Sequence, residues 1–303
     1  MRVLVLMSTY NGERFLREQI DSILTQEGVD VYLLVRDDGS KDNTCEILDE
    51  YTSKYENIEV IKAENIGFVK SFSKLVEMAQ NYKVEVGYYA FSDQDDVWMS
   101  HKLKTACDYL SRMDQNNPLL FSSNSLYVDE HMNELGLFHK NKPYRTKENV
   151  MIYPTEQGCS MVFNKKAVEL YNLHHPTISW HDRWMCLICN FMGEMTYCQE
   201  PLFYYRLHGN NTLGSEASFL QRFYKDFAVL VKTERDSYSM AKEFLGFYQN
   251  SLSRNDKSIM EVYINYRKNL KKKWILLSSK RFQENKKIWN RIKKGGLVLL
   301  NRL

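Results

Sequence analysis

The segment "VGYYAFSDQDDVW" (residues 86–98) joins a mostly apolar run to a cluster of acids. Residues 86–92 do not alternate between apolar and polar positions, which is typical of a strand buried on both faces of a parallel sheet. Asp93, Asp95 and Asp96 follow within four positions, and neighbouring carboxylates repel one another unless a positive charge compensates them. The segment therefore predicts a buried strand that ends beside a site for a cation or a cationic ligand.

The same succession of strand and loop recurs along the first 125 residues. Strands are predicted at residues 2–7, 31–36, 57–62 and 119–124, and the segments between strands carry apolar residues at helical spacing. Strands that alternate with helices form a mostly parallel sheet that helices cover on both faces. We therefore expect an α/β fold with a mostly parallel central sheet.

Polar side chains follow each of the first four predicted strands at its carboxyl end. Ser8–Asn11 follow the first strand, Asp37–Gly39 the second, Asn65 and Gly67 the third, and Asp93–Asp96 the fourth. Because parallel strands end at the same edge of a sheet, the four clusters should meet there, where open α/β sheets bind ligands. This coincidence predicts one ligand site built from four loops.

The residues at this edge admit a functional and a structural interpretation. An Asp93-x-Asp95 pair can hold Mg²⁺ or Mn²⁺ against a diphosphate, since these ions prefer oxygen ligands, but the same acids could simply cap the helix that follows. Asp38 could accept hydrogen bonds from a nucleobase or ribose, while its neighbours could instead cap the second helix. Tyr10 could stack on a base or pack against the protein.

Two further candidates lie beyond residue 125. Asp182 could be a general base, for which one carboxylate facing a substrate hydroxyl suffices. Alternatively, Ser179 and Asp182 could form a capping box at the start of a helix. His208 follows an extended run and could be a third metal ligand, or else a packed or surface histidine.

The regular alternation of strands and helices ends near residue 125. Residues 153–164 and 195–212 predict extended chain, the first around a glycine turn, and residues 179–191 predict a helix. From Ser215 onward the pattern is almost wholly helical. The second half of the chain is therefore expected to add short extended segments and helices to the central sheet.

The composition is that of an ordinary soluble protein of 303 residues, with 44% hydrophobic and 26% charged residues. Its apolar runs are shorter than the ~20 residues of a membrane span, and the first apolar run is too short for a signal peptide. The six scattered cysteines do not suggest a disulfide framework, which favours a reducing compartment. We therefore expect a cytoplasmic protein.

The net charge of +3 conceals an uneven distribution. Residues 265–303 contain 13 Lys and Arg but one acid, so they carry +12, whereas residues 1–264 carry −9. The cations alternate with aromatic and aliphatic residues, a pattern typical of helices that lie on anionic membrane surfaces. We expect this tail to bind the inner face of the cell membrane. A solvated helix face is the plainer alternative, and the acidic body argues against nucleic acid.

The chain resembles the family-2 glycosyltransferases with the GT-A fold in five segments that occur in order: "LMSTYNG", "RDDGSKDNT", "ENIGFVKSF", "FSDQDDVW" and "HDRW". "DQDDVW" together with "YRLHGNNT" is similar to bacterial rhamnosyltransferases of surface polysaccharide synthesis. The resemblance covers residues 1 to about 235. It implies a GT-A domain over residues 1–214, with a nucleotide-sugar-binding half (1–125) and an acceptor-binding half (126–214), and a helical, basic C-terminal region (215–303).

The resemblance also implies a role for each candidate residue. The implied roles are nucleoside binding, ribose binding, metal binding and general-base catalysis. They map onto Thr9, Tyr10 and Asp38 for the nucleoside, Asp93 for the ribose, Asp95 and His208 for Mn²⁺ or Mg²⁺, and Asp182 for the base.

Two departures from the family's pattern bear on these roles. Many relatives have a Glu-Asp pair where this chain has His181–Asp182. The QxxRW pattern of processive synthases lacks its Gln, because position 180 is Trp. We therefore expect one sugar to be added per encounter.

The reaction that the resemblance implies is inverting, metal-dependent transfer of a sugar to a hydroxyl of a growing, lipid-linked surface polysaccharide. dTDP-L-rhamnose is the expected donor, with UDP-hexoses and UDP-N-acetylhexosamines as alternatives. A catalytically inactive nucleotide-sugar-binding membrane scaffold is a further alternative. A phospho-acceptor receiver domain is disfavoured, because such domains need an acidic pair after the first strand, where this chain has Ser8–Tyr10.

Overall fold

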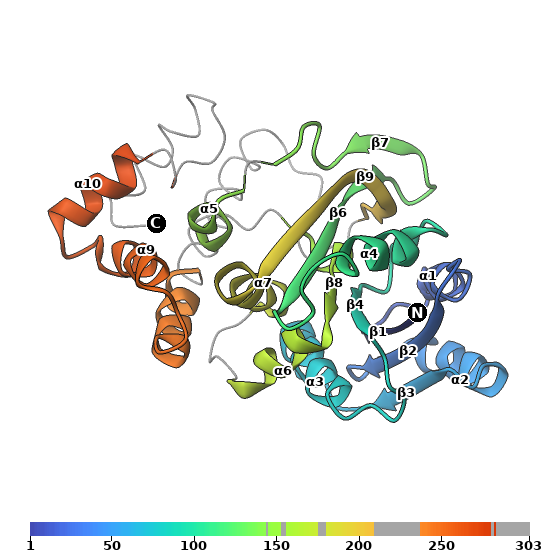
Figure 1. Cartoon of the computed structure of the whole chain (residues 1–303). Coiled ribbons are helices and arrows are strands. Elements are labelled where there is room, and N and C mark those ends of the chain that lie inside the picture. The colour runs from blue at the N-terminus through green and yellow to red at the C-terminus, as the bar shows by residue number, and fades with distance from the viewer. Residues whose placement is uncertain (144, 153–155, 175–179, 209–236, 280–281, 283–303) are drawn as a thin grey trace.

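The computed structural model describes residues 1–143, 145–152, 156–174, 180–208, 237–279 and 282. Within these residues one mixed sheet contains nine strands (Figure 1). They are β1 (Arg2–Thr9), β2 (Asp30–Asp37), β3 (Ile58–Lys62), β4 (Tyr88–Ser92), β5 (Val97–Trp98), β6 (Leu119–Val128), β7 (Glu134–Leu137), β8 (Val162–Asn164) and β9 (Glu194–Arg206). The spatial order is β3-β2-β1-β4-β8-β6-β9-β5, and β7 pairs with β6 outside this path.

Helices cover both faces of the sheet. One face packs against α1 (Leu16–Leu24), α2 (Thr44–Lys54) and α4 (Lys102–Leu110). The other packs against α3 (Phe68–Ala79), α6 (Lys165–Leu173) and α7 (His181–Met192). The remaining described helical segments are α5 (Lys147–Ile152), the 3-10 turn η1 (Gly158–Ser160), residues 237–248, α9 (Arg254–Asn265) and α10 (Leu270–Ser278).

The first four strands are parallel, as the sequence predicts. β2 pairs with β1 and with β3, and β1 pairs with β4, all in the same direction. Side chains of β1 alternate between the two cores, with Leu4 and Leu6 in one and Val3 and Val5 in the other. Every side chain from Val3 to Met7 is buried, which explains why this part of β1 is continuously apolar. The predicted α/β fold is confirmed.

The second half of the sheet is less regular than the sequence indicates. The predicted strand at 119–124 is confirmed as β6, but it is longer and does not neighbour β4. Strand β8 lies between them and runs antiparallel to both, while β6 pairs in parallel with β9. The predicted extended segments at 153–164 and 195–212 therefore contribute β8 and β9, apart from residues 153–155 and 209–212, which lie outside the described residues.

The predicted helix at 179–191 is confirmed as α7, which begins at His181 with Trp180 as its N-cap residue. Ser179, the other half of the possible capping box, lies outside the described residues. So does the stretch 215–236, where a helical pattern begins in the sequence. No helix within the described residues has the length and apolarity required to cross a membrane.

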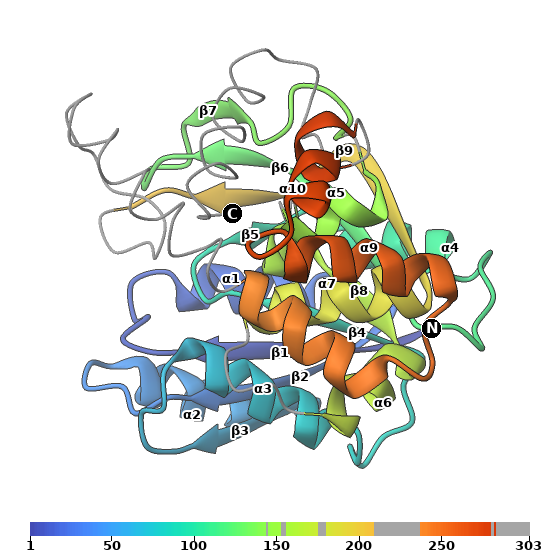
Figure 2. The same cartoon turned by 90° about the vertical axis from the view of Figure 1, so that its left-hand side faces the viewer.

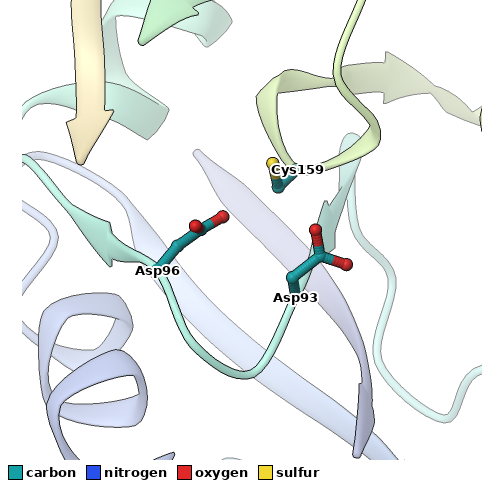
Figure 3. Close-up of side chains that lie close together, drawn as sticks. All are labelled: Asp93, Asp96 and Cys159. Atoms are coloured by element: carbon teal, nitrogen blue, oxygen red, sulfur yellow. The ribbon is translucent and has the colours of Figure 1, made fainter. Parts of the chain in front are cut away.

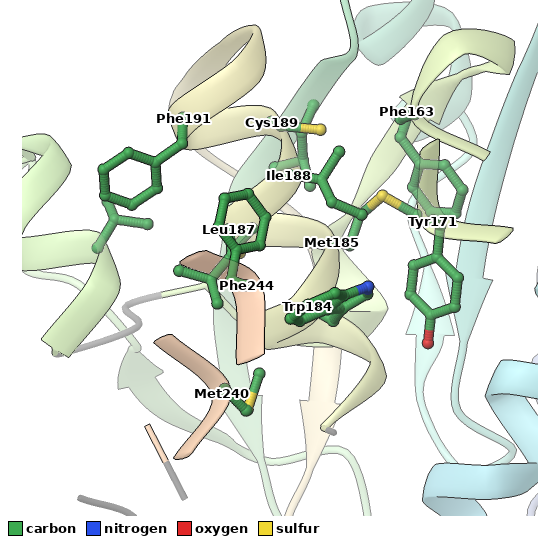
Figure 4. Close-up of a cluster of buried hydrophobic side chains, with 14 of the residues drawn as sticks. Phe163, Tyr171, Trp184, Met185, Leu187, Ile188, Cys189, Phe191, Met240 and Phe244 are labelled. Carbon is green, nitrogen blue, oxygen red and sulfur yellow. The ribbon is translucent and has the colours of Figure 1, made fainter. Parts of the chain in front are cut away.

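The helices after residue 236 share a core with the sheet-forming part of the chain. Figure 4 shows Met240 and Phe244 beside Trp184 of α7. The rings of Trp184 and Phe244 lie 5.3 Å apart between centroids, and both side chains are fully buried. Helix α7 is therefore held from two sides, by the sheet and by the later helices, which fixes the position of its N-terminus. The predicted boundary at residue 214 lies outside the described residues.

Candidate active site

The loops that follow β1, β2 and β4 are tied together by hydrogen bonds. The backbone N–H of Asp38 donates to the carbonyl oxygen of Thr9 at 2.8 Å. The Gln94 side chain accepts the Tyr10 backbone N–H at 2.8 Å and donates to the Tyr10 carbonyl oxygen at 3.1 Å. The predicted meeting of these loops at one edge of the sheet is therefore confirmed.

Asp38 joins the loop after β3 to the same edge. Its buried carboxylate accepts the backbone N–H groups of Ile66 at 2.9 Å and Gly67 at 2.8 Å, and it pairs with the Arg36 guanidinium. Gly67 has a φ of +82°, a conformation that favours glycine. Asp38 therefore shapes the β3–α3 loop, and its contact with a nucleoside stays a prediction.

Thr9 and Tyr10, to which the family resemblance also assigns nucleoside binding, differ in exposure. Thr9 is fully buried, and its hydroxyl donates to the Asp37 carboxylate at 3.0 Å. Tyr10 is 47% exposed. The Thr9 side chain thus stabilises the β2–α2 loop through Asp37, whereas the Tyr10 ring is accessible to a ligand.

Asp95 and His208 come together although they are far apart in the sequence. The His208 Nε2 atom lies 2.8 Å from an Asp95 carboxylate oxygen, and the side chains are 10% and 19% exposed, respectively. The two groups are thus close enough to bind one cation. Carboxylate oxygen and imidazole nitrogen suit Mn²⁺, and the carboxylate also suits Mg²⁺.

Arg206, at the end of β9, holds this pair in place. Its Nε donates to the Asp95 carbonyl oxygen at 3.0 Å, and its backbone N–H donates to the Asp96 carboxylate at 3.4 Å. The same guanidinium donates to the Glu130 carbonyl oxygen at 3.2 Å and pairs with Glu18. Arg206 is not among the residues predicted from the sequence, although its place two residues before His208, at the end of an extended segment, was a usable signal.

Asp93 and Asp96 rise from the two ends of one loop toward Cys159 of η1 (Figure 3). One ligand atom from each of the three lies within 4.8 Å of the others. Burial and then the Asp95 charge raise the pKa of Asp93 to about 7, and the same causes raise the pKa of Asp96 well above its usual value. The buried Oδ2 of Asp96 has no hydrogen-bond partner among the described residues. The acids therefore favour a proton or a cation among them.

A buried lysine lies near these acids and was also missed. The Lys102 ammonium donates to the Cys159 carbonyl oxygen at 2.6 Å and lies 3.4 Å from the centroid of the Trp98 ring. Burial lowers the pKa of Lys102 to about 7, against the opposing effect of the Asp96 and Asp93 charges. A lysine in an amphipathic segment looks like a surface residue, so the sequence gives little sign of this role.

Asp182 comes near Asp93 and the η1 turn from helix α7. It lies in the first turn of α7, and its charge is among the causes that raise the pKa of Asp93. A Cβ atom at Gly158 would lie 3.3 Å from the Asp182 Cβ, so the η1 turn passes directly beside this acid. The structure therefore brings Asp182, the predicted base, close to Asp93, the predicted ribose ligand.

His181, which replaces the family's usual glutamate, belongs to the core. Its ring stacks on Phe72 with centroids 4.0 Å apart and meets Phe91 edge to face at 4.8 Å. Burial lowers the pKa of His181 to about 4, so the ring is neutral at physiological pH. The departure from the Glu-Asp pattern therefore leaves Asp182 as the acidic group at this position.

Comparisons with known proteins identify the family of the chain. The family model described as glycosyl transferase family 2 matches residues 4–169. The chain is 30% identical to the dTDP-rhamnosyl transferase RfbG of Shigella flexneri over 232 residues, which cover 72% of this chain and 76% of that protein. It is 26% identical to an uncharacterized glycosyltransferase, alr2836, of Nostoc over 72% of this chain and 68% of that protein.

Solved structures show the fold. The S. aureus TarS fragment 1–349 in complex with UDP-GlcNAc superposes with a TM-score of 0.59 at 14% identity, covering 100% of this chain and 93% of that chain. The predicted GT-A fold is thereby confirmed, with helices in the C-terminal region. From the matching family model and the curated relative, this chain is a glycosyltransferase and belongs to glycosyl transferase family 2.

Proposed function

We propose that the chain transfers one L-rhamnose from dTDP-L-rhamnose, with inversion, to a hydroxyl of a growing, lipid-linked surface polysaccharide at the cytoplasmic face of the cell membrane. The observation that carries the catalytic part is the Asp95–His208 pair. The charges of Asp95 and Asp182 both act on Asp93, which supports a common site for these residues. The similarity to the rhamnosyl transferase of Shigella supports the donor.

The donor's diphosphate needs positive charge, which the acidic edge of the sheet cannot supply by itself. Asp95 and His208 would hold Mn²⁺ or Mg²⁺, with Asp93 nearby on the ribose side. The orphaned, buried Oδ2 of Asp96 and the raised pKa values of Asp93 and Asp96 fit a cation at this place. When bound, the ion stabilises the negative charge that develops on the leaving nucleoside diphosphate.

Asp182 takes the acceptor's proton in this proposal. As the acceptor oxygen forms its bond to the anomeric carbon, the bond from that carbon to the diphosphate breaks, and the diphosphate leaves with the electron pair. The hydroxyl proton passes to the Asp182 carboxylate while charge develops, because a free hydroxyl has a pKa far above 7. Attack on the face opposite the leaving group inverts the anomeric centre. Tyr10, Thr9 and Asp38 would position the nucleoside at the strand edge.

The test is a donor screen with the purified chain and Mn²⁺. dTDP-L-rhamnose, UDP-glucose, UDP-galactose and UDP-N-acetylglucosamine are compared by thermal shift and by release of nucleoside diphosphate. The proposal expects the largest shift and the fastest release with dTDP-L-rhamnose. Preference for a UDP-sugar would keep the transferase and reject the donor. Binding of a nucleotide sugar without release or transfer, with a panel of acceptors, would favour the inactive scaffold.

A further inference from the structure

Helix α10 exposes two large apolar side chains to solvent. Leu270 is 84% exposed and Trp274 is 68% exposed, the highest values among the large hydrophobic residues that the structure describes. A fully exposed tryptophan costs free energy in water, because its ring is the largest apolar surface of any side chain. Such a pair therefore indicates a surface that another apolar phase covers.

The two side chains lie on one face of an anchored helix. Positions four apart in a helix point the same way, so Leu270 and Trp274 are neighbours. The opposite face carries Leu276, which is fully buried, and Ile275, which packs against the same core. The side chain of Asn269 caps the helix by accepting the Lys272 backbone N–H at 3.0 Å. The exposed face is thus built into an ordered helix.

Positive charge surrounds this apolar pair. Lys271, which follows Leu270 in the helix, and Lys268, in the turn just before the helix, are both exposed. Lys272 is directed elsewhere, because its ammonium donates to the Glu261 carbonyl oxygen of α9 at 3.2 Å. The chain from residue 265 onward carries +12, whereas the first 264 residues carry −9. The surface therefore complements a polyanion, and its apolar centre favours a lipid phase over a nucleic acid.

The position of the helix leaves this face accessible. Figures 1 and 2 agree that α9 and α10 lie along one outer side of the molecule, on the far side from β1, β2 and β3. A flat membrane can approach that side without displacing the parallel strands that form the candidate donor site. We name the exposed surface made of Leu270, Lys271 and Trp274 of α10, together with Lys268 in the turn just before the helix, the α10 surface.

We propose that the α10 surface docks the enzyme on anionic phospholipid. Trp274 and Leu270 enter the boundary between headgroups and acyl chains, where tryptophan is favoured, and Lys268 and Lys271 contact lipid phosphates. The docking does not depend on which sugar is transferred. The docking test can therefore fail while the proposed function stands, and the donor test can fail while the docking stands.

The first test measures sedimentation of the full chain with vesicles of phosphatidylcholine that contain about one third phosphatidylglycerol. The double variant Leu270→Ser/Trp274→Ser should lower the partition coefficient by about tenfold or more, since each side chain loses its apolar contact. The control Leu135→Ser/Leu173→Ser removes two exposed leucines from other surfaces and should bind as the wild type does. Equal binding by the two double variants would overturn the proposal.

The second test separates charge from apolar contact. Lys268→Gln/Lys271→Gln should weaken binding to the anionic vesicles by about fivefold per lysine at low salt, and should change binding to pure phosphatidylcholine little. Loss of binding to both kinds of vesicle alike would contradict the assigned lysine contacts. Binding of the wild type to single-stranded RNA but not to anionic vesicles would assign the surface to nucleic acid and reject the membrane.

The third test locates the inserted side chain by quenching of tryptophan fluorescence with brominated lipid. Trp274→Phe keeps an aromatic ring at the site and should lose most of the quenching seen with the wild type. Trp289→Phe removes another tail tryptophan and should retain it. The reverse result would show that a different part of the tail meets the lipid, and would refute the α10 surface as the docking site even if sedimentation is unchanged.

Discussion

The imidazole Nε2 of His208 lies 2.8 Å from a carboxylate oxygen of Asp95, across a sequence separation of 113 residues. The pairing of β5 with β9 sets this distance. Val97 lies opposite Tyr204 in that antiparallel pair, so the residues just before β5 meet those just after β9. His208, which follows β9, therefore joins the site that the loops after the first four strands form.

Replacing Asp95 by Ala should abolish metal-dependent binding of the nucleoside diphosphate, because His208 then supplies one imidazole nitrogen and the carboxylate charge is lost. Isothermal calorimetry of dTDP or UDP with and without Mn²⁺ measures the effect. Asp30→Ala, at the opposite edge of the sheet, is the matched control and should bind normally. An unchanged metal-dependent affinity in Asp95→Ala would remove this residue from the metal site.

Asp182→Asn should retain donor binding and lose transfer by roughly 10²–10⁴-fold, the usual effect of losing a general base. The amide has nearly the same shape as the carboxylate but cannot accept the proton. Donor affinity from calorimetry and turnover from product formation are measured on the same preparation. Turnover near the wild-type rate would show that another group accepts the proton.

Arg206→Lys should raise the Mn²⁺ concentration needed for half-maximal activity by about tenfold, on the scale seen when groups that orient metal ligands are lost. Lysine keeps the buried charge but cannot reach Asp95, Glu18 and Glu130 at once. Arg14→Lys also lies beside Glu130, in an exposed salt bridge, and is the control. A lowered melting temperature with an unaltered metal dependence would mean that Arg206 serves only the fold.

Acid should destabilise the protein through His181. Burial lowers its pKa in the folded state to about 4, whereas the ordinary value is 6.5. Between these values His181 binds a proton in the unfolded chain but not in the folded protein, so this residue contributes a loss of stability of about 2–3 kcal/mol as the pH drops from about 6.5 toward 4. The raised pKa values of Asp93 and Asp96 act in the opposite direction, so a comparison with a variant is needed to isolate the His181 contribution.

His181→Phe should remove much of this acid sensitivity, because phenylalanine keeps the stack on Phe72 and has no proton to bind. Urea unfolding at neutral pH and at about pH 4.5 gives the comparison. His131→Gln, an exposed histidine, should leave the pH dependence as it is. Parallel losses of stability in the wild type and His181→Phe would place the acid sensitivity elsewhere.

Much of the donor half could be predicted from the sequence. Strands buried on both faces have to be continuously apolar, and the loops after them have to be polar if they bind a ligand, so the edge formed by Thr9, Asp38 and Asp95 is visible in the pattern. The Asp95–His208 contact followed from the family resemblance rather than from spacing, since nothing local in the sequence links two residues that are 113 positions apart.

The place of strand β8 in the sheet and the burial of the two cations of the site could not be predicted, because the local sequence gives no sign of them. Strand β8 has three residues, which is too short for a period to show, yet it separates β4 from β6. Lys102 and Arg206 are buried cations, and a charged residue is usually read as exposed. Only the tertiary contacts with Cys159 and Asp95 reveal that these cations support the acids of the site.

The carboxylates of Asp37 and Asp38 already accept hydrogen bonds from backbone N–H groups of the neighbouring loops. The cost in conformational entropy of ordering these loops is thus met when the chain folds and not when the donor arrives. A nucleotide sugar would bind to loops that are already ordered, so little binding free energy would be lost in rearranging the main chain. Selection among nucleotide sugars would then rest with side chains at this edge that still face the solvent, such as Tyr10, which is 47% exposed.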